Sequence, residues 1–125
     1  MPMQLTVTRD ASWRPIREGV TVTPLRMDRG KGTFLMHYDP GSRSPTHTHP
    51  GGEEIYVISG VGRLDDLAIG PGDFIYTPPG EGHTLYAETE VVIHVTLPEP
   101  GARLSTWPVK VTPGRASIFT WAGWP

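Results

Sequence analysis

The sequence predicts an all-β domain that closes into a sandwich or barrel, and three observations support this fold class. No stretch of the chain has the pattern of a good helix. The apolar runs are short and rich in β-branched and aromatic residues, which is typical of strands. Glycine and proline, with 15 and 14 residues, separate these runs, as expected for a turn-rich domain whose sheet closes to remove its edges.

The first half of the chain contains four such runs. Residues 4–8 (QLTVT), 19–23 (GVTVT) and 33–38 (TFLMHY) are predicted as strands, and the Asp-Pro-Gly turn at 39–41 ends the third. After the Gly-Gly pair at 51–52, the run IYVIS at 55–59 predicts a fourth strand.

The second half continues the pattern. The run RLDDLAI at 63–69 predicts a hairpin that turns at Asp65 and Asp66. Gly-Pro-Gly and Pro-Pro-Gly turns at 70–72 and 78–80 then separate the remaining runs. The strands predicted here are residues 74–77 (FIYT), 84–87 (TLYA), 91–96 (VVIHVT) and 117–121 (SIFTW).

Length and composition limit the classes of function. The 125 residues fit one domain over residues 1–125, of which 98–125 form a tail rich in proline and tryptophan. The chain has no cysteine, so disulfides and thiolate sites are excluded and any metal must bind to nitrogen and oxygen. The net charge of −2 makes a nucleic-acid partner unexpected.

Location is predicted from two further patterns. No window resembles a transmembrane span of about 20 apolar residues. The first residues, MPMQLTVTRD, lack the basic and then apolar layout of a signal peptide. A cytoplasmic protein without a membrane partner is therefore expected.

The residues suited to chemistry lie between 41 and 83. His47 and His49 are two apart, so on an extended chain their imidazoles project from the same face. Glu53 follows after three intervening residues, and a second block, GDFIYTPPGEGH, ends on His83. Three imidazoles and one carboxylate suit a first-row divalent metal and leave positions open for water or substrate. The pattern predicts a metal site on these four residues.

The first block also resembles the first motif of the cupin superfamily. That motif reads glycine, five residues, His-x-His, three or four residues, glutamate, six residues, glycine. Gly41, His47, His49, Glu53 and Gly60 match it without a gap.

The second block resembles the second cupin motif, with Gly72, Pro78, Gly80 and His83 in the family's spacing. Ala87 stands where the family often has an asparagine that is not a ligand. The resemblance implies a cupin barrel, that is, a double-stranded β-helix or jelly roll, with a metal-binding core at about residues 33–97.

Within this superfamily the chain resembles the ChrR-type cupin-like group. The resemblance rests on Trp13 and Pro15, on the runs HYDPGSRSPTHTHPGGEE and PPGEGH, and on the short segment between Gly60 and Gly72. The group includes the zinc-binding domain of an anti-sigma factor and dioxygenases that cleave hydroxyacetophenones or β-diketones.

The resemblance implies an enzyme, with a dioxygenase or related oxidoreductase as the first expectation. One divalent transition metal per chain, with Fe(II) favoured over Zn, Mn, Ni, Cu and Co, would chelate a small diketone, hydroxyketone or phenolic substrate directly. An isomerase, cyclase or lyase is an alternative, as is a non-catalytic sensor or regulatory cupin. A sugar-handling cupin would need basic residues, for which Arg43 and Arg63 are the nearest candidates.

Several side chains have two interpretations. Spacing to Gly60 and strand alternation favour Glu53 over Glu54 as the ligand, although a bulge at 51–52 would reverse the parity. If His94 faces inward, it would be a proton shuttle or a hydrogen-bond donor to a metal ligand. If it faces outward, it would lie on the outer face of the barrel or at an oligomer contact. A structural role is favoured for His37.

Aromatic residues carry the last two expectations. Aromatic side chains are mostly buried in proteins, so most of this set is expected in the core: Phe34, Tyr56, Phe74, Tyr76 and Tyr86. The apolar termini exceed what one small barrel covers and predict a homodimer. The residues behind that prediction are Leu5, Val7, Trp107, Phe119, Trp121 and Trp124.

Overall fold

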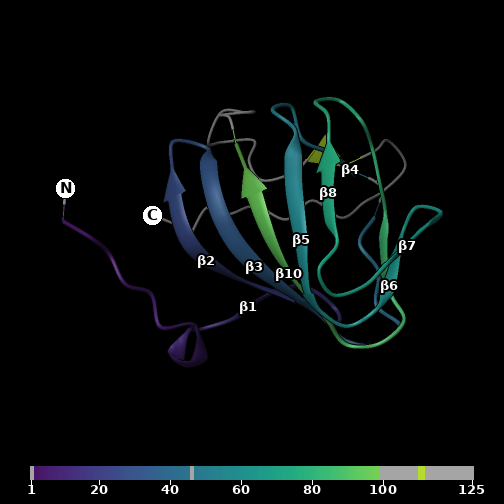
Figure 1. Cartoon of the computed structure of the whole chain (residues 1–125), viewed down its shortest axis with the longest axis horizontal. Coiled ribbons are helices and arrows are strands. Elements are labelled where there is room, and N and C mark those ends of the chain that lie inside the picture. Colours follow the sequence, from purple (N-terminus) through teal and green to yellow (C-terminus); the bar gives the residue numbers. More distant parts are fainter. Residues whose placement is uncertain (1, 46, 99–109, 112–125) are drawn as a thin grey trace.

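The computed structural model describes residues 2–45, 47–98 and 110–111, and strands account for most of their regular structure (Figure 1). In chain order the elements are the 3-10 turn η1 (Thr8–Asp10) and the strands β1 (Arg14–Arg17), β2 (Val20–Asp28), β3 (Lys31–Tyr38), β4 (His47–Thr48), β5 (Glu53–Ser59), β6 (Gly62–Leu64), β7 (Leu67–Ile69), β8 (Phe74–Thr77), β9 (Leu85–Ala87), β10 (Val91–Leu97) and β11 (Lys110–Val111).

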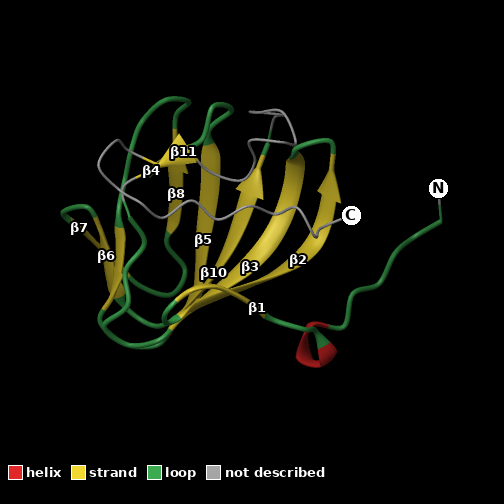
Figure 2. Ribbon diagram, turned by 180° about the vertical axis from the view of Figure 1, so that it is seen from behind, coloured by secondary structure: helices red, strands yellow, loops and turns green. Residues whose placement is uncertain are grey.

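The strands form antiparallel sheets. The large sheet has the order β1-β2-β3-β10-β5-β8, a smaller one has the order β7-β6-β9, and β11 pairs with β4. Seen from the front and from behind, the large sheet curves as one layer, with β6 and β7 at one side and β4 near one end of β8 (Figures 1 and 2). The all-β prediction is confirmed.

Strand alternation separates a buried inner face from an outer face. Along β10, the residues Val91, Ile93 and Val95 are buried, whereas the residues between them are half-buried. β10 lies between β3 and β5 in the large sheet, so its buried residues stand beside the buried residues of both neighbours. The apolar core consists of Val20, Val22, Phe34, Tyr38, Ile55, Val57, Leu64, Ile69, Leu85, Ala87, Val91, Ile93, Val95 and Leu97.

The glycine that ends the first motif has a packing reason. Gly60 follows β5 with φ of +86°, and a Cβ atom there would lie 1.8 Å from the carbonyl oxygen of Glu90. Only glycine fits where the end of β5 approaches the start of β10 this closely. This motif position therefore serves the barrel and not the chemistry.

Most strand predictions are confirmed, with shifts at their ends. β8 coincides with the predicted run 74–77, and β6 and β7 form the predicted hairpin around Asp65 and Asp66. β1 was not predicted, because Pro15 argues against a strand; proline is tolerated there because β1 is at the edge of the sheet. The second half of β2 was not predicted either, because Pro24 argues against a strand. The pairing of β2 with β3 is irregular just after this proline.

The strand predicted at residues 4–8 is wrong. In the described chain these residues pair with no strand, and the 3-10 turn at Thr8–Asp10 begins where the strand was expected to end. Met3 is 97% exposed and Leu5 is 87% exposed. Figure 1 shows this segment extending away from the sheet. β propensity alone does not form a strand that lacks a partner.

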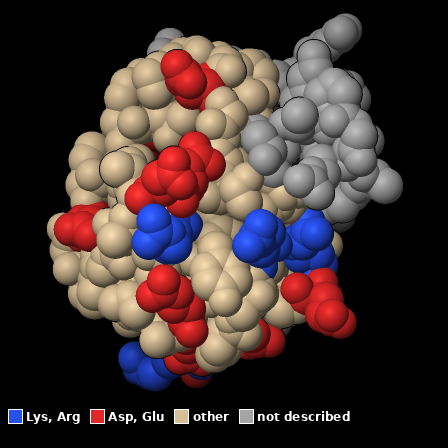
Figure 3. Space-filling view, turned by 90° about the vertical axis from the view of Figure 1, so that its right-hand side faces the viewer, with Lys and Arg blue, Asp and Glu red and all other residues tan. Residues whose placement is uncertain are grey.

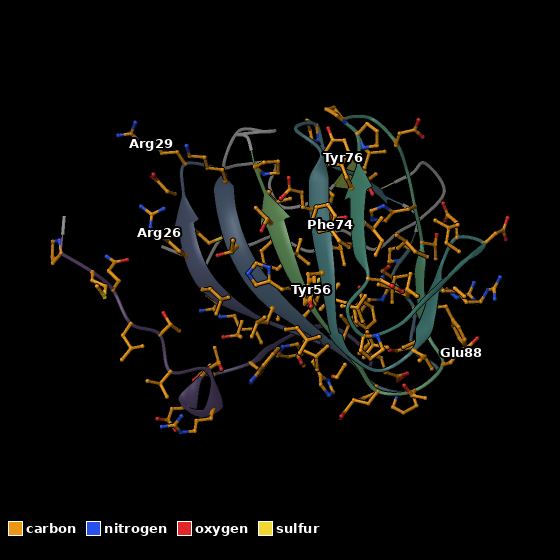
Figure 4. The ribbon with its side chains drawn as sticks, viewed as in Figure 1. Arg26, Arg29, Tyr56, Phe74, Tyr76 and Glu88 are labelled. Atoms are coloured by element: carbon orange, nitrogen blue, oxygen red, sulfur yellow. The ribbon has the colours of Figure 1, made fainter. Side chains whose placement is uncertain are left out.

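The prediction that the aromatic residues are mostly core holds for Phe34, which is buried, but is wrong for three others. Tyr56, Phe74 and Tyr76 are 47%, 61% and 53% exposed, and they lie on the outer face of β5 and β8 (Figure 4). They alternate with inward residues such as Ile55, so the pleat turns them outward.

Charged side chains of both signs lie interspersed on the face drawn in Figure 3, without a continuous basic area. Within the described residues, no helix has the length and apolar character needed to cross a membrane. The strand predicted at 117–121 and the tail residues Trp107, Phe119, Trp121 and Trp124 lie outside the described residues.

Candidate metal centre

Three of the four predicted ligands come together at one end of the barrel. His49 follows β4, Glu53 begins β5, and His83 precedes β9. Nε2 of His49 lies 2.9 Å from one carboxylate oxygen of Glu53, and Nε2 of His83 lies 2.9 Å from the other. The three residues are 6%, 4% and 5% exposed, so this polar group is enclosed by the protein.

The backbone joins the two loops that carry the histidines. The carbonyl oxygen of His49 accepts hydrogen bonds from the amides of Gly52 and Gly80 at 3.1 and 3.4 Å. Gly52 has φ of +85°, and a Cβ atom there would lie 3.1 Å from the carbonyl oxygen of Thr77. The Gly-Gly turn therefore brings the loop of His49 against the loop of His83 at a distance that a larger residue would increase.

Thr77 orients the ring of His83 and was not predicted as a site residue. Its Oγ1 lies 3.1 Å from Nδ1 of His83, which leaves Nε2 to face Glu53. A histidine that binds metal through one nitrogen commonly donates a hydrogen bond through the other. The sequence indicates this role of Thr77 only weakly, because the prediction requires knowing that Thr77 on β8 pairs with Glu53 on β5.

The electrostatics of this group favour an ionised carboxylate. Burial opposes ionisation of Glu53, but the imidazoles of His49 and His83 outweigh burial and hold the pKa of Glu53 far below its ordinary value. Burial also opposes protonation of His83, yet its contact with Glu53 raises the pKa of His83 above the ordinary value. The site is built to hold a negative charge beside groups that can carry positive charge.

Tyr38 is a second residue that the sequence interpretation missed. It is 2% exposed on the inner face of β3, and burial, opposed by a hydrogen bond with Ser44 and aided by the charge of Glu53, raises its pKa well above the ordinary value. The phenol therefore stays protonated at neutral pH. Its parity with the core residue Phe34 on β3 was the signal that it faces inward.

The donor atoms of the site test whether a metal would fit. His49 Nε2 and Glu53 Oε1 are buried, and each meets its neighbour in a close ion-pair contact that lacks hydrogen-bond geometry. Donors that converge in this way, with nitrogen and oxygen chemistry, suit a first-row divalent ion. In the part of the chain that the structure describes, which leaves out the side chain of His47, no group of three or more His, Asp or Glu residues is arranged around a common metal position.

The fourth predicted ligand, His47, is described by its backbone alone. It belongs to β4 and pairs with Val111 of β11. Its neighbour Thr48 separates it from His49, so the two histidines keep the spacing of the predicted site. The side chain of His47 lies outside the described residues.

The remaining candidates lie away from the site. Glu54 and His94 pair across β5 and β10 with Thr96 and Tyr56, on the outer face. A role of His94 as a proton shuttle or as a hydrogen-bond donor to a metal ligand is therefore not supported, because the sheet separates its side chain from Glu53. His37 is also on the outer face, where its Nε2 lies 2.8 Å from Glu90, consistent with the structural role expected for it.

The two arginines considered for a sugar ligand point elsewhere. Arg43 lies over the ring of Tyr86, at 5.3 Å from its centroid, and Arg63 donates a hydrogen bond to the carbonyl oxygen of Asp66. Both are exposed. These contacts do not direct either guanidinium group toward the buried cluster of His49, Glu53 and His83.

Comparisons with known proteins agree with this fold. A family model described as the ChrR cupin-like domain matches residues 2–99. The (R)-mandelonitrile lyase of Granulicella tundricola is 34% identical over 68 residues, and the alignment covers 50% of this chain and 52% of the lyase.

Solved structures extend the likeness. The crystal structure of Rhodobacter sphaeroides SigE in complex with the anti-sigma ChrR matches with a TM-score of 0.65 and 25% identity, over 71% of this chain and 49% of that chain. The polyketide cyclase RemF from Streptomyces resistomycificus matches with a TM-score of 0.74 and 20% identity, over 99% of this chain and 95% of that chain. The likeness to RemF concerns the fold alone. The chain spans about half the length of the lyase and of the matched chain in the anti-sigma complex.

Proposed function

The chain belongs to the ChrR cupin-like domain family, and from this premise we propose that it is a metal-dependent enzyme acting on a small oxygen-bearing organic molecule. One observation carries the proposal: a buried carboxylate and two imidazoles converge at 2.9 Å at the end of an apolar barrel. A buried charged group of this kind is costly unless it has a function or a firm partner.

The proposed metal ligands are His47, His49, Glu53 and His83, with one divalent ion per chain and Fe(II) as the favoured ion. Bound there, the ion would act as a Lewis acid on a substrate oxygen. Four protein ligands would leave two positions of an octahedron for the substrate, which suits the two oxygens of a diketone or hydroxyketone.

The other residues have roles that follow from their places. Thr77 holds the ring of His83 through Nδ1. The protonated hydroxyl of Tyr38 interacts with Ser44 and donates to Sδ of Met36 at 4.0 Å, so this side chain packs the inner wall of the barrel. Ile55 and Val57, on the same strand face as Glu53, make the surroundings apolar and exclude water.

Two classes of reaction are candidates for the proposed enzyme. Oxidative cleavage of a diketone or an aromatic hydroxyketone is the first candidate. The second is a lyase reaction on an aromatic cyanohydrin, and the specific observation in its favour is the similarity to the (R)-mandelonitrile lyase. Both need an apolar site with one polar centre that polarises the oxygen of the substrate.

The experiment begins with metal content. Protein purified without added metal is analysed by plasma mass spectrometry as wild type, Glu53→Gln and Glu54→Gln. We expect wild type and Glu54→Gln to retain about one ion per chain and Glu53→Gln to lose most of it, because only Glu53 faces the histidines. Equal retention in the two variants would contradict the ligand assignment.

Activity is then measured on iron-loaded protein. O₂ uptake with a panel of diketones and hydroxyketones tests the first reaction, and release of benzaldehyde and cyanide from mandelonitrile tests the second. His49→Ala, loaded with iron to the same content, should be inactive in whichever assay the wild type passes. A metal-bound wild type that fails both assays would favour a sensor or regulatory cupin.

A further inference from the structure

The backbone that follows His83 is held from two sides. His83 leads through Thr84 into β9, which pairs with β6 on one side. On the other side the segment of residues 41–44 runs beside β9, where the amide of Ser44 donates a hydrogen bond to the carbonyl oxygen of Leu85 at 2.9 Å. The strand that receives the chain from His83 therefore lies between β6 and this segment.

Side chains replace the backbone partners of β9 at the end next to His83. The amide of Leu85 donates a hydrogen bond to Oγ of Ser44 at 3.1 Å, and Ser44 is 5% exposed. The amide of Thr84 donates a hydrogen bond to a carboxylate oxygen of Asp65 at 2.9 Å. Successive amides of an extended strand point to opposite sides, so these two bonds hold the start of β9 to both of its neighbours.

Asp65 uses its side chain where a strand residue would use its backbone. In a regular antiparallel ladder, the two residues of a hydrogen-bonded pair exchange two backbone bonds. The amide of Asp65 donates to the carbonyl oxygen of Thr84 at 2.8 Å, but the return bond from Thr84 ends on the carboxylate of Asp65. The chain turns at Asp65, where φ is +51°, and the carboxylate takes the place of the carbonyl oxygen as acceptor.

The two aspartates of the β6–β7 turn differ in their relation to His83. Asp66 accepts a hydrogen bond from Arg63 through its backbone carbonyl oxygen, a contact that does not need the side chain. The charge of Asp65, in contrast, reaches the imidazole. Burial lowers the pKa of His83, and the contact with Glu53 and then the charge of Asp65 oppose burial and raise it.

We propose that Asp65 is a positioning residue for the metal ligand His83, acting through its hydrogen bond with the amide of Thr84. The inference rests on the proposed metal site and adds to it a residue from the β6–β7 hairpin, which supplies none of the proposed ligands. Without the carboxylate, the amide of Thr84 would bond to water and the loop that presents His83 would have more freedom. An imidazole that is ordered only when the metal binds lowers the affinity for the metal.

Asp65 can be changed without disturbing the core, because it is exposed on the turn. Asp65→Gly removes the carboxylate and keeps the backbone bond to Thr84, and glycine adopts a positive φ without strain. Asp65→Asn keeps an acceptor oxygen, and asparagine also tolerates a positive φ. Asp66→Gly is the matched control, because it removes the other carboxylate of the same turn and the same charge.

The test uses Co²⁺ as the probe, added to metal-free protein in competition with a chromophoric chelator, and the absorption spectrum of the bound ion is recorded. We expect Asp65→Gly to weaken Co²⁺ binding at least about fivefold and to change the spectrum, since His83 would no longer meet the ion in a fixed geometry. Asp65→Asn and Asp66→Gly should stay within about twofold of the wild type and keep its spectrum. Circular dichroism should show the same fold in all three variants.

Three results would overturn the inference. Asp65→Gly protein with the affinity and spectrum of the wild type would show that the carboxylate serves the turn alone, even if urea denaturation finds the variant less stable. Asp65→Asn protein as weak as Asp65→Gly would show that the hydrogen bond is not the cause, and an equally weak Asp66→Gly would show a general effect of the turn. All three results leave the proposed metal site in place, whereas a wild type that binds no Co²⁺ removes that site and the inference with it.

Discussion

The two faces of β5 differ in almost every property although their residues alternate in the chain. Glu53, Ile55 and Val57 point into the barrel and are at most 4% exposed. Tyr56 and Ile58 point outward and are about half exposed. Chemistry is therefore confined to the inner face, and the outer face of the same strand is available for contact with another molecule. Two comparisons between the faces, one between two loops and one pH series test this division.

The largest difference should be in stability. Ile93→Ala removes a side chain that is 1% exposed in the middle of the core and should lower the free energy of unfolding by about 2–5 kcal/mol. Val92→Ala, one residue away on the half-buried face, should cost about 1 kcal/mol or less. Urea denaturation of both variants gives the two values, and similar losses would contradict the division.

A smaller difference should separate two threonines. Thr77→Val removes the hydroxyl beside Nδ1 of His83 and should weaken metal binding by about 10–100-fold. Thr96→Val, on the outer face of β10, should leave the affinity unchanged. Competition with a chromophoric chelator measures both constants, and an equal effect would show that Thr77 does not position the histidine.

Two glycines sharpen the comparison at the level of the loops. Gly52 and Gly72 both have positive φ, so alanine should cost each about 1 kcal/mol of stability. A Cβ atom at Gly52 would also meet the carbonyl oxygen of Thr77 at 3.1 Å, whereas one at Gly72 meets nothing within 4 Å. Metal affinity should therefore fall in Gly52→Ala only, as a chelator titration of both variants would reveal.

The smallest effect should be on pH dependence. In metal-free protein the raised pKa of His83 means that the protonated ring contributes stability below the ordinary histidine pKa of about 6.5. That contribution is lost as the pH rises through the raised value, whereas the lowered pKa of Glu53 keeps its contribution constant over this range.

Thermal melts of metal-free protein should thus show a midpoint that falls over the interval from the ordinary histidine pKa of about 6.5 up through the raised pKa of His83, with a weaker trend in His83→Gln. Added metal should reverse the trend, because protons compete with the ion for the imidazole. A metal-free midpoint that rises over this interval would contradict the contact between His83 and Glu53.

Sequence reasoning recovered the features that repeat along the chain and missed those that depend on partners. Alternation placed Glu53 inside and Glu54 outside, and turn chemistry placed the hairpin at Asp65 and Asp66. The Gly-Pro-Gly turn predicted at 70–72 is closed by Asp73, whose carboxylate accepts a hydrogen bond from the amide of Gly70 at 2.8 Å.

The failures have a common physical cause. Residues 4–8 have strand propensity, but a strand forms only where another strand pairs with it. The role of Thr77 depends on the register of β5 with β8, and that of Tyr38 depends on which side chains of β3 are buried. Local sequence patterns specify neither property. The outward direction of His94 follows from alternation with Ile93 and Val95, but it required knowing which parity of β10 is buried.

The position of β10 between β3 and β5 has a consequence for the order of folding. Tyr38 pairs with Val91, and Ile55 pairs with Val95, so two contacts of the central strand span long stretches of chain. Closing such loops is slow, and until β10 arrives the earlier strands expose hydrogen-bonding edges. On the ribosome all four proposed ligands emerge before β10 does, yet the barrel that orders them is still incomplete. We therefore expect metal to enter late, after the last central strand has joined the sheet.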